Sequence, residues 1–244
     1  MRVAPLFLLL ATLAPQGDDK GWVELAGPNG LKAWKAPHGD WADASEVRPD
    51  PANPKRLAYQ PGSGILVNGR TGRTRNIVTT EDFGDIEAHI EFMIPKGSNA
   101  GVKFEGLYEI QIFDSYGKAQ AKGDDCGGIY PRAELLPTYH HIDDGYPPRV
   151  NACRPAGEWQ TLDVTFFAPR FDADKKKIKD ARFAKVVLNG QLIHENQSVP
   201  GGTGHAYHQK EIPAGPILLQ ADHGPVAFRS VKVRPLDAAK EPAK

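Results

Sequence analysis

The stretch Asp85-Ile-Glu-Ala-His-Ile-Glu-Phe-Met-Ile94 carries the most regular alternation of apolar and polar residues in the chain. Successive side chains of a β-strand point to opposite faces of its sheet. One face of this strand would therefore carry Ile86, Ala88, Ile90, Phe92 and Ile94. The other face would carry mainly charged residues. A strand with one buried and one solvated face is typical of antiparallel sheets, so this stretch predicts an all-β fold.

Shorter strand-like runs lie on both sides of this stretch and extend the prediction to most of the chain. These runs are 64–68, 76–80, 101–105, 107–113, 159–168, 182–188, 191–194, 217–220 and 226–234. Asn189-Gly190 is a strong hairpin signal, whereas residues 20–60 look irregular and residues 115–157 form a long loop. The sequence shows no amphipathic helix and no internal repeat. We expect an antiparallel β-sandwich or jelly roll with long functional loops.

Composition and the N-terminus limit the classes of function. The chain has 244 residues, and its 30 Lys and Arg balance its 30 Asp and Glu, so no basic field attracts nucleic acid. Arg2 precedes an apolar run at 4–14, which predicts a signal peptide at 1–16 and a secreted or periplasmic protein. The run is too short to span a bilayer, and we expect no membrane insertion. One domain would then span 20–236, followed by a charged tail at 237–244.

The two cysteines, Cys126 and Cys153, both lie in loop sequence rich in Gly and Pro. An even number of cysteines in an exported chain permits a disulfide. Free or buried thiols are the alternative, and we weigh the disulfide slightly above it. The spacing fits neither a zinc site nor a redox motif.

The run Tyr108-Glu-Ile-Gln-Ile-Phe-Asp114 is the strongest candidate for chemistry. Alternation places Glu109 and Gln111 together on one exposed sheet surface, and a bulge near Phe113 would bring Asp114 to the same side. Two carboxylates and an amide on one face suit the binding of a sugar. The E-x-Q-x-x-D spacing is also similar to the E-x-D-x-x-E strand of laminarinase-like glucanases, although solvated residues on an outward face are the simpler alternative.

Two further segments supply candidate polar side chains. The loop 130–144 contains Arg132, Glu134, His140, His141, Asp143 and Asp144. Asp222 and His223 lie between two late strands in Gln220-Ala-Asp-His-Gly224, where a turn could present a catalytic histidine. His205 and His208 could bind a metal only in a suitable conformation, and a flexible glycine loop is the favoured interpretation of that segment.

Several short motifs occur in an order that resembles a known family. They are Ser98-Asn-Ala-Gly-Val102, Tyr108–Asp114, Gly127-Gly-Ile-Tyr130, Asn151-Ala-Cys-Arg-Pro155, Gly157-Glu-Trp-Gln160 and Leu219-Gln-Ala-Asp-His-Gly224. Together they look like the 3-keto-disaccharide hydrolase domain over residues 20–236. The resemblance implies a concanavalin A-like jelly roll that acts on small carbohydrates whose glucose-type ring carries a ketone at C3.

The resemblance gives positions, and the roles at these positions are our hypothesis, because such a substrate needs a base, an oxyanion stabiliser and an acid. Glu109 or His223 would be the base, and Asp114 or His141 the acid. The enolate would be stabilised by Lys103, Arg154 or a bound divalent metal. Other groups would bind substrate, and these are Asn99, Gln111, Arg132, Glu134, His140, Gln220 and Asp222. No cofactor other than a possible metal is expected.

Three alternatives to this enzyme remain open from the sequence. A non-catalytic carbohydrate-binding module could share the same fold, since fold does not settle function. A laminarinase-like glycoside hydrolase would use two carboxylates about 5–5.5 Å apart. An interaction domain of a larger secreted assembly comes last, because the sequence shows no second domain or long linker. No obligate protein partner is evident.

Overall fold

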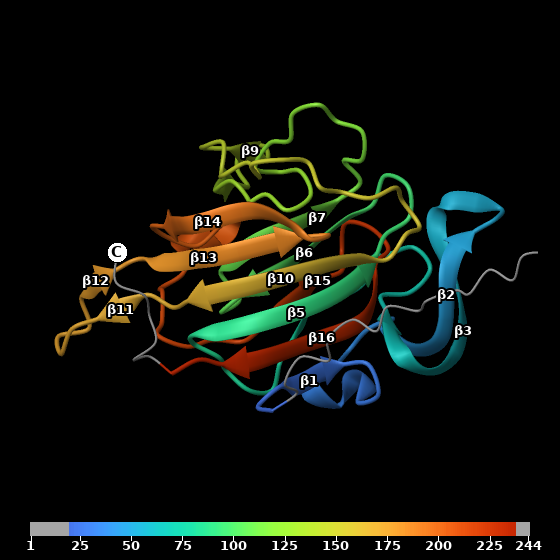
Figure 1. Ribbon diagram of the computed structural model, residues 1–244, viewed down its shortest axis with the longest axis horizontal. Coiled ribbons are helices and arrows are strands. Elements are labelled where there is room, and N and C mark those ends of the chain that lie inside the picture. The colour runs from blue at the N-terminus through green and yellow to red at the C-terminus, as the bar shows by residue number, and fades with distance from the viewer. Residues whose placement is uncertain (1–19, 238–244) are drawn as a thin grey trace, which may run out of the picture.

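The computed structural model describes residues 20–237, and within this range the chain is almost entirely β-structure. The predicted signal peptide at 1–16 and all but Asp237 of the predicted charged tail lie outside the described residues. Two antiparallel sheets pack face to face (Figure 1). The predicted antiparallel β-sandwich is therefore confirmed. Within residues 20–237 no helix has the length and hydrophobicity needed to cross a membrane.

The larger sheet has eight strands in the order β14-β13-β10-β5-β16-β3-β2, and β1 pairs with β16. Its strands are β1 (Val23–Ala26), β2 (Ala42–Asp50), β3 (Asn53–Val67), β5 (Ile86–Met93), β10 (Gln160–Phe167), β13 (Ala181–Leu188), β14 (Gln191–Val199) and β16 (Ala227–Pro235). The central strand β5 buries its apolar face as the alternation predicted. Asn189 and Gly190 both have positive φ in the β13–β14 turn, as the hairpin signal required.

The smaller sheet has four strands in the order β4-β15-β6-β7. They are β4 (Ile77–Val78), β15 (Leu218–Gln220), β6 (Asn99–Phe104) and β7 (Tyr108–Phe113). Two short pairs stand apart, β8 (Ala133–Glu134) with β9 (His140–His141) and β11 (Arg170–Phe171) with β12 (Lys177–Lys179). The helical elements in the described range are two 3₁₀ turns, η1 (Gly30–Ala33) and η2 (His205–His208).

Aromatic side chains from both sheets meet in the core between them. Phe104 of the smaller sheet lies 5.3 Å from Phe166 and 5.4 Å from Phe183 of the larger sheet, measured between ring centroids. Tyr108 lies 5.5 Å from Phe166. Rings at these separations in tilted or edge-on contact add to the stabilisation given by their buried area. This cluster fixes the smaller sheet, and with it the strands that carry the candidate site.

The expectation of irregular structure at 20–60 is wrong. This range contains β1, η1, β2 and most of β3. Strands β2 and β3 form a long hairpin that curves away from the two layers in Figure 1. Prolines interrupt its polar–apolar alternation, and its pairing shifts register at Ala44 and near Pro49, so the pattern of a half-buried strand is absent.

The favoured disulfide is absent, since both cysteines are buried free thiols. A hydrogen bond to Cys153, followed by burial, raises the pKa of the Cys126 thiol. The loop is instead held by hydrogen bonds. Asn151 donates to the carbonyl oxygens of Ser115 at 2.7 Å and Lys118 at 3.0 Å. The amide of Cys126 donates to the Ser115 hydroxyl at 3.2 Å.

Candidate functional site

The register of three neighbouring strands assembles the floor of a pocket. Lys103 on β6 pairs with Glu109 on β7, and Gly101 pairs with Gln111. On the other side of β6, Gln220 of β15 pairs with Gly101. Side chains directly opposite each other across antiparallel strands share a face. The polar side chains of three strands therefore line one hollow of about 390 Å³, within the usual range of about 300–1,000 Å³ for small-ligand sites.

Gly101 leaves the space that the Glu109 side chain occupies. A Cβ at position 101 would lie 2.2 Å from Glu109 Oε1 and 3.0 Å from its carboxyl carbon. Any larger residue in the middle of β6 would therefore collide with the carboxylate. This is a close-approach role for a strand glycine, and it is local to the pocket floor.

Glu109 and Lys103 form a buried ion pair at the base of the pocket. Lys103 Nζ lies 3.1 Å from Glu109 Oε2, and the two side chains are 15% and 3% exposed. Removing one member of a buried pair leaves an uncompensated charge, so each side chain depends on the other for its place in the pocket. The pocket thus presents an ammonium and a carboxylate side by side in a place with little water.

Two amide oxygens at the pocket floor have no protein partner. Gln111 Oε1 and Gln220 Oε1 are buried, and neither accepts a hydrogen bond from the described residues. The Gln111 amide nitrogen, by contrast, donates to Asn99 Oδ1 and to the Asp124 carbonyl, each at 3.3 Å. Buried acceptors without partners are unfavourable. They would be satisfied by donors such as water or ligand hydroxyl groups, and sugars carry many hydroxyls.

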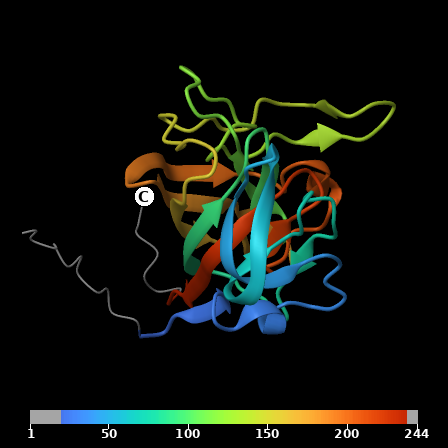
Figure 2. The ribbon, with the colours of Figure 1, turned by 90° about the vertical axis from the view of Figure 1, so that its right-hand side faces the viewer.

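The wall of the pocket comes from the long loop predicted at 115–157. Residues 127–130 run along the free edge of β7, where Gln111 N donates to Gly128 O at 2.9 Å and Tyr130 N donates to Glu109 O at 3.1 Å. Tyr130 is thereby fixed beside Glu109. Figure 2 shows the β8–β9 hairpin, in yellow-green at the top of the view, projecting beyond the two sheets. This hairpin adds Leu135 and Tyr139 to the wall.

Two tyrosines and a histidine form a hydrogen-bonded group at this wall. The hydroxyls of Tyr130 and Tyr139 lie 2.6 Å apart. His141 Nε2 lies 3.2 Å from each of them. Burial raises the pKa of both tyrosines, and the nearby Glu109 carboxylate raises them further. Both phenols are therefore protonated at neutral pH. One hydroxyl donates to the other, which leaves one O–H to donate into the pocket or to His141.

The opposite rim is the turn that carries His223. His223 Nδ1 lies 2.6 Å from Asp222 Oδ1. A neutral imidazole bonded in this way has its proton on Nδ1 and its basic nitrogen at Nε2. Asn68 fixes the turn by donating to the carbonyls of Ala221 at 3.2 Å and Gly224 at 2.9 Å. The imidazole thus has a defined orientation at the pocket edge.

The pocket brings together six of the residues proposed from the sequence. They are Asn99, Lys103, Glu109, Gln111, Gln220 and His223. Asp222 and His141 lie just behind it, bonded to His223 and to the two tyrosines respectively. Glu109 and Gln111 are each only 2% exposed, so the expected open sheet surface is wrong. The loop edge and hairpin described above cover that face.

Besides Asp222 and His141, five further proposed residues lie outside the pocket lining. Asp114 does not reach the polar face, because β6 and β7 pair regularly from Tyr108 to Phe113 and the expected bulge is absent. Its carboxylate instead accepts a hydrogen bond from the Gly97 amide at 2.8 Å. The others are held elsewhere, Arg132 by Asp143, Arg154 by the Trp159 carbonyl, His140 by the Thr138 carbonyl and Glu134 by Tyr207 and His208.

Sequence reasoning missed five lining residues, which are Tyr130, Leu135, Tyr139, Gly204 and His205 as a pocket residue. Four of them lie in loops, and His205 begins η2. The Gly127-Gly128 pair before Tyr130 was a usable signal, because glycines permit close backbone approach to a strand edge. The remaining four are brought in by the folding of the hairpin and of η2, which local sequence does not specify.

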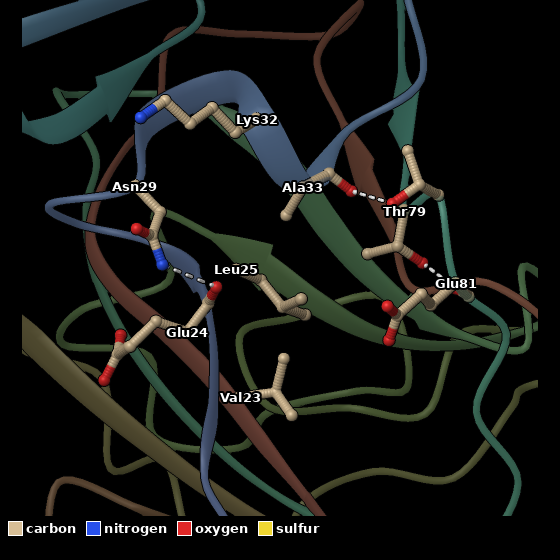
Figure 3. A pocket seen from close by; sticks show the side chains of 9 residues that line it. Val23, Glu24, Leu25, Asn29, Lys32, Ala33, Thr79 and Glu81 are labelled. Carbon is tan, nitrogen blue, oxygen red and sulfur yellow. Dashed lines mark hydrogen bonds between the residues drawn. The ribbon is translucent and has the colours of Figure 1, made fainter.

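A second hollow of about 260 Å³ lies beside β1 and η1 (Figure 3). Its residues include Glu24, Lys32 and Glu81, but none of those proposed from the sequence. The hydroxyl of Thr79, also in its lining, donates to the Glu81 carbonyl at 2.6 Å, and that of Thr80 donates to the Ala33 carbonyl at 3.2 Å. Its hydroxyl groups therefore hold the local backbone together.

Comparison with known proteins decides the family. The sequence profile of the 3-keto-alpha-glucoside-1,2-lyase-like domain matches residues 21–234, nearly the whole described chain. The chain belongs to this family. It is accordingly a carbohydrate-active protein of the glycoside-cleaving kind, as the ordered motifs indicated. None of the curated proteins matches the chain.

Solved structures from Parabacteroides distasonis share the fold of this family member. One proposed glycosyl hydrolase is 22% identical with a TM-score of 0.61, over 89% of this chain and 84% of that one. A second is 19% identical with a TM-score of 0.53, over 88% and 99%. A third is 16% identical with a TM-score of 0.55, over 89% and 95%. At these identities the likeness concerns the fold.

Proposed function

We propose that this family member cleaves 3-keto-glycosides by elimination followed by hydration. The observation that carries the proposal is the convergence of a buried Lys103–Glu109 pair and an oriented His223 on one pocket with unpartnered amide oxygens. The family description, which names a 3-keto-alpha-glucoside lyase, supports the same substrate class.

The substrate's own chemistry sets what the pocket has to supply. A ketone at C3 acidifies the proton on C2, so a modest base can remove it and leave an enolate. The enolate expels the substituent at C1, whose oxygen takes a proton as the C1–O bond breaks. Water then adds across the C1–C2 double bond. The net reaction consumes one water and yields a 3-keto sugar and an alcohol.

The roles follow from where the side chains lie. His223 is the base, because Asp222 holds the proton on Nδ1 and leaves Nε2 basic. Glu109 is the second candidate for this role, as it also lines the pocket. Lys103 stabilises the enolate oxygen, and Glu109 holds Lys103 in place. Tyr130 or Tyr139, backed by His141, protonates the leaving oxygen.

A conventional two-carboxylate glycosidase is less well supported. Glu109 is the only carboxylate among the residues that line the pocket, and Asp114 is bonded to Gly97 outside it. A retaining mechanism needs a second carboxyl group about 5–5.5 Å away. A binding module remains the second candidate, because the tyrosines and amides could hold a sugar without cleaving it.

The test compares a 3-keto-disaccharide with the same disaccharide unoxidised. We expect the purified chain to cleave only the keto form. Cleavage of the unoxidised sugar would overturn the proposal in favour of a glycosidase, and binding without cleavage would favour a binding module.

A second measurement separates the roles within the pocket. In D₂O, His223→Gln should abolish exchange of the C2 hydrogen, as followed by NMR. Tyr139→Phe should retain exchange and slow release of the alcohol. Full exchange in His223→Gln together with none in Glu109→Gln would transfer the base role to Glu109.

A further inference from the structure

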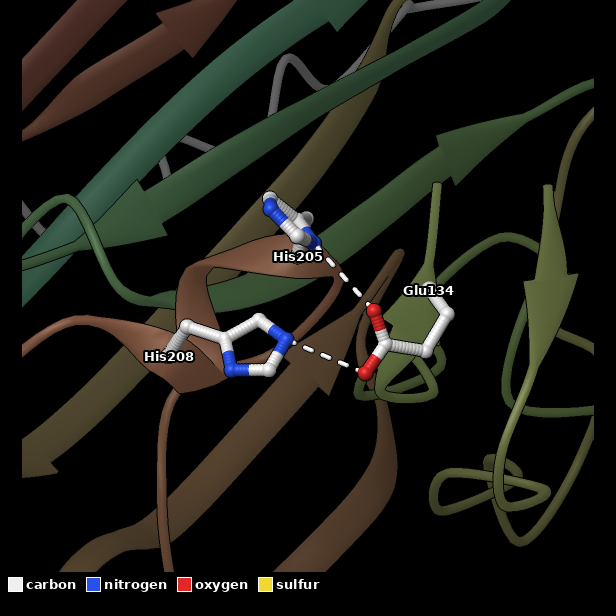
Figure 4. A group of neighbouring side chains, drawn as sticks. All are labelled: Glu134, His205 and His208. Atoms are coloured by element: carbon white, nitrogen blue, oxygen red, sulfur yellow. Dashed lines mark hydrogen bonds and ion pairs between the residues drawn. The ribbon is translucent and has the colours of Figure 1, made fainter. Parts of the chain in front are cut away.

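Three potential metal ligands meet at the rim of the pocket, away from its floor. Glu134 belongs to β8, whereas His205 and His208 belong to η2. Glu134 Oε1 lies 3.1 Å from His208 Nε2, and Glu134 Oε2 lies 3.9 Å from His205 Nδ1. Figure 4 shows both rings turned toward the carboxylate. Within residues 20–237 this is the one group of three such side chains whose ligand atoms all lie within 4.8 Å of one another.

The 3₁₀ geometry of η2 explains why the two histidines act together. Side chains at positions i and i+3 of a 3₁₀ helix lie nearly above one another, because each turn takes three residues. The rings of His205 and His208 are accordingly 4.8 Å apart between centroids. The expectation of a flexible glycine loop here is therefore wrong. Gly204 starts the turn with a φ of 54°, a value that glycine adopts without strain.

Backbone hydrogen bonds hold the glutamate opposite the histidines. Ala133 N donates to Gly204 O at 3.1 Å, and Gly204 N donates to Pro131 O at 2.8 Å. These bonds join the start of β8 to the start of η2. The position of Glu134 relative to the two rings is thus set by main-chain contacts as well as by side-chain ones.

A neighbouring tyrosine orients the carboxylate. The Tyr207 hydroxyl donates to Glu134 Oε1, and the Arg132 guanidinium lies 5.8 Å from the centre of the Tyr207 ring. Arg132 is itself held by Asp143, with Nε 2.6 Å from its carboxylate. Metal-binding carboxylates are commonly fixed by such outer hydrogen bonds, whose loss costs about 10–100-fold in affinity.

We propose that Glu134, His205 and His208 bind a divalent transition-metal ion of the zinc type. Two imidazoles and a carboxylate are the ligand set of many catalytic zinc sites, which keep a fourth position open. Ligand atoms around a tetrahedral zinc ion are about 3.3 Å apart, as follows from bond lengths of about 2.0–2.2 Å. The present separations need only small side-chain rotations to reach that value.

The location of the site indicates a use for the open position. His205 also lines the sugar pocket, so an ion on this cluster would lie at the pocket edge. There it could bind a hydroxyl or carbonyl oxygen of the carbohydrate, and this consequence alone rests on the proposed function. The exposure of the two histidine side chains, 47% and 48%, leaves the site open to ions from solvent.

The first test is calorimetric titration of the full chain with zinc chloride after removal of metals by a chelator. We expect one equivalent to bind, and at least a 100-fold loss of affinity in His205→Gln and in Glu134→Gln. Tyr207→Phe should lose about 10–100-fold while keeping all three ligands. His38→Gln is the matched control, since His38 lies outside the cluster and contacts the Trp34 carbonyl.

The second test locates the ion by anomalous scattering at the zinc edge in crystals of the wild type. A peak between the three side chains would support the proposal. No binding, or equal affinity in the wild type, Glu134→Gln and His38→Gln, would overturn it. Thermal melting of each variant checks that the variant still folds. Because zinc binding is measured without sugar, it can succeed where cleavage of the keto-glycoside fails, and the converse also holds.

Discussion

Strands β5 and β7 both alternate apolar residues with charged or amide residues, yet their polar faces meet different surroundings. On β5 the polar face is half-buried and forms ion pairs across the outer surface of the larger sheet, such as Glu91 with Arg229 and Glu87 with Arg234. On β7 five of six residues are buried, including Glu109 and Gln111. Alternation therefore indicates which residues share a face, but not what covers that face.

The cover over β7 consists of chain that lies far from it in sequence. Residues 127–130 pair with its edge, and the β8–β9 hairpin and η2 close the sides of the pocket. Among residues 20–237, the charged side chains on the outer face of β5 stay half-buried and pair with those of the adjacent strands. The same sequence pattern yields a half-buried outer surface in one sheet and the floor of the candidate pocket in the other.

The largest effect we expect comes from filling the space that Glu109 uses. Gly101→Ala would place a methyl group 2.2 Å from Glu109 Oε1 and displace the carboxylate from Lys103. A misplacement of about 1 Å at a reacting group can cost about 100-fold in rate, so kcat/KM on a 3-keto-disaccharide should fall at least that much.

Gly201→Ala is the control for this change, because a Cβ at position 201 has no atom within 4 Å. Full activity in Gly101→Ala would mean that the position of Glu109 does not matter for the reaction.

The same substitution in the two strands should affect stability very differently. Glu109→Gln leaves Lys103 buried without its partner and should cost about 3–5 kcal/mol of unfolding free energy. Glu91→Gln breaks an ion pair with Arg229, whose side chain is 42% exposed, and should cost about 0–1 kcal/mol. Urea unfolding measures both. Equal losses would contradict the contrast between the two faces.

A third carboxylate, that of Glu105 in the β6–β7 turn, should make the stability of the fold depend on pH. Both oxygens of Glu105 are buried without a partner, and burial, with smaller contributions from Asp85 and Glu211, raises its pKa from 4.5 to about 8. Between pH 4.5 and about 8 the folded state therefore keeps a proton on Glu105 that the unfolded state has released. The stability that this protonated carboxyl group contributes is full below pH 4.5 and is lost as the pH rises toward 8.

Glu105→Gln removes this dependence while keeping the shape of the side chain. Relative to the wild type, the variant should gain up to about 1.4 kcal/mol per pH unit across that window. Unfolding at several pH values between 5 and 8 measures the difference. Parallel stability profiles for the two proteins would show that Glu105 does not titrate in this range.

The smallest effect concerns the outer face of β5. A hydrogen bond that His89 donates to Asp163, the residue directly opposite on β10, raises the pKa of His89 above 6.5. The pair therefore stabilises the fold fully below pH 6.5 and loses this contribution as the pH rises through the raised pKa. Asp163→Asn should cost less than about 1 kcal/mol at low pH and nothing at high pH. NMR titration of His89 would show no raised pKa if the bond does not form.

Much of the fold was predictable because local patterns specify it. The alternation at 86–94 gave a central strand, and Asn189-Gly190 gave a hairpin turn in which both residues have positive φ. The β2–β3 hairpin was missed because its prolines and register shifts remove the alternation. The pairing of β6 with β7 also has no bulge, which leaves Asp114 outside the pocket.

The candidate site was predictable only in part. The residues on strands were predicted, whereas most of those outside strands were not. Asn99, Lys103, Glu109, Gln111 and Gln220 lie on strands, where a period of two residues fixes which side chains share a face. Tyr130 and Tyr139 come from loops and His205 comes from η2, and the positions of these segments depend on distant contacts. The Glu134–His205–His208 cluster shows the same dependence, since residues about 70 positions apart meet through β8 and η2.

By itself, the sequence determined the all-β class, the family and the polar face of β7, because each depends on residue order and a short repeat. Only the tertiary structure decided that this face is buried, that Lys103 pairs with Glu109, and that two histidines face a glutamate. These features depend on register between strands and on loop paths. Strand register depends on which face is buried as well as on the turns, and loop paths depend on contacts with distant segments.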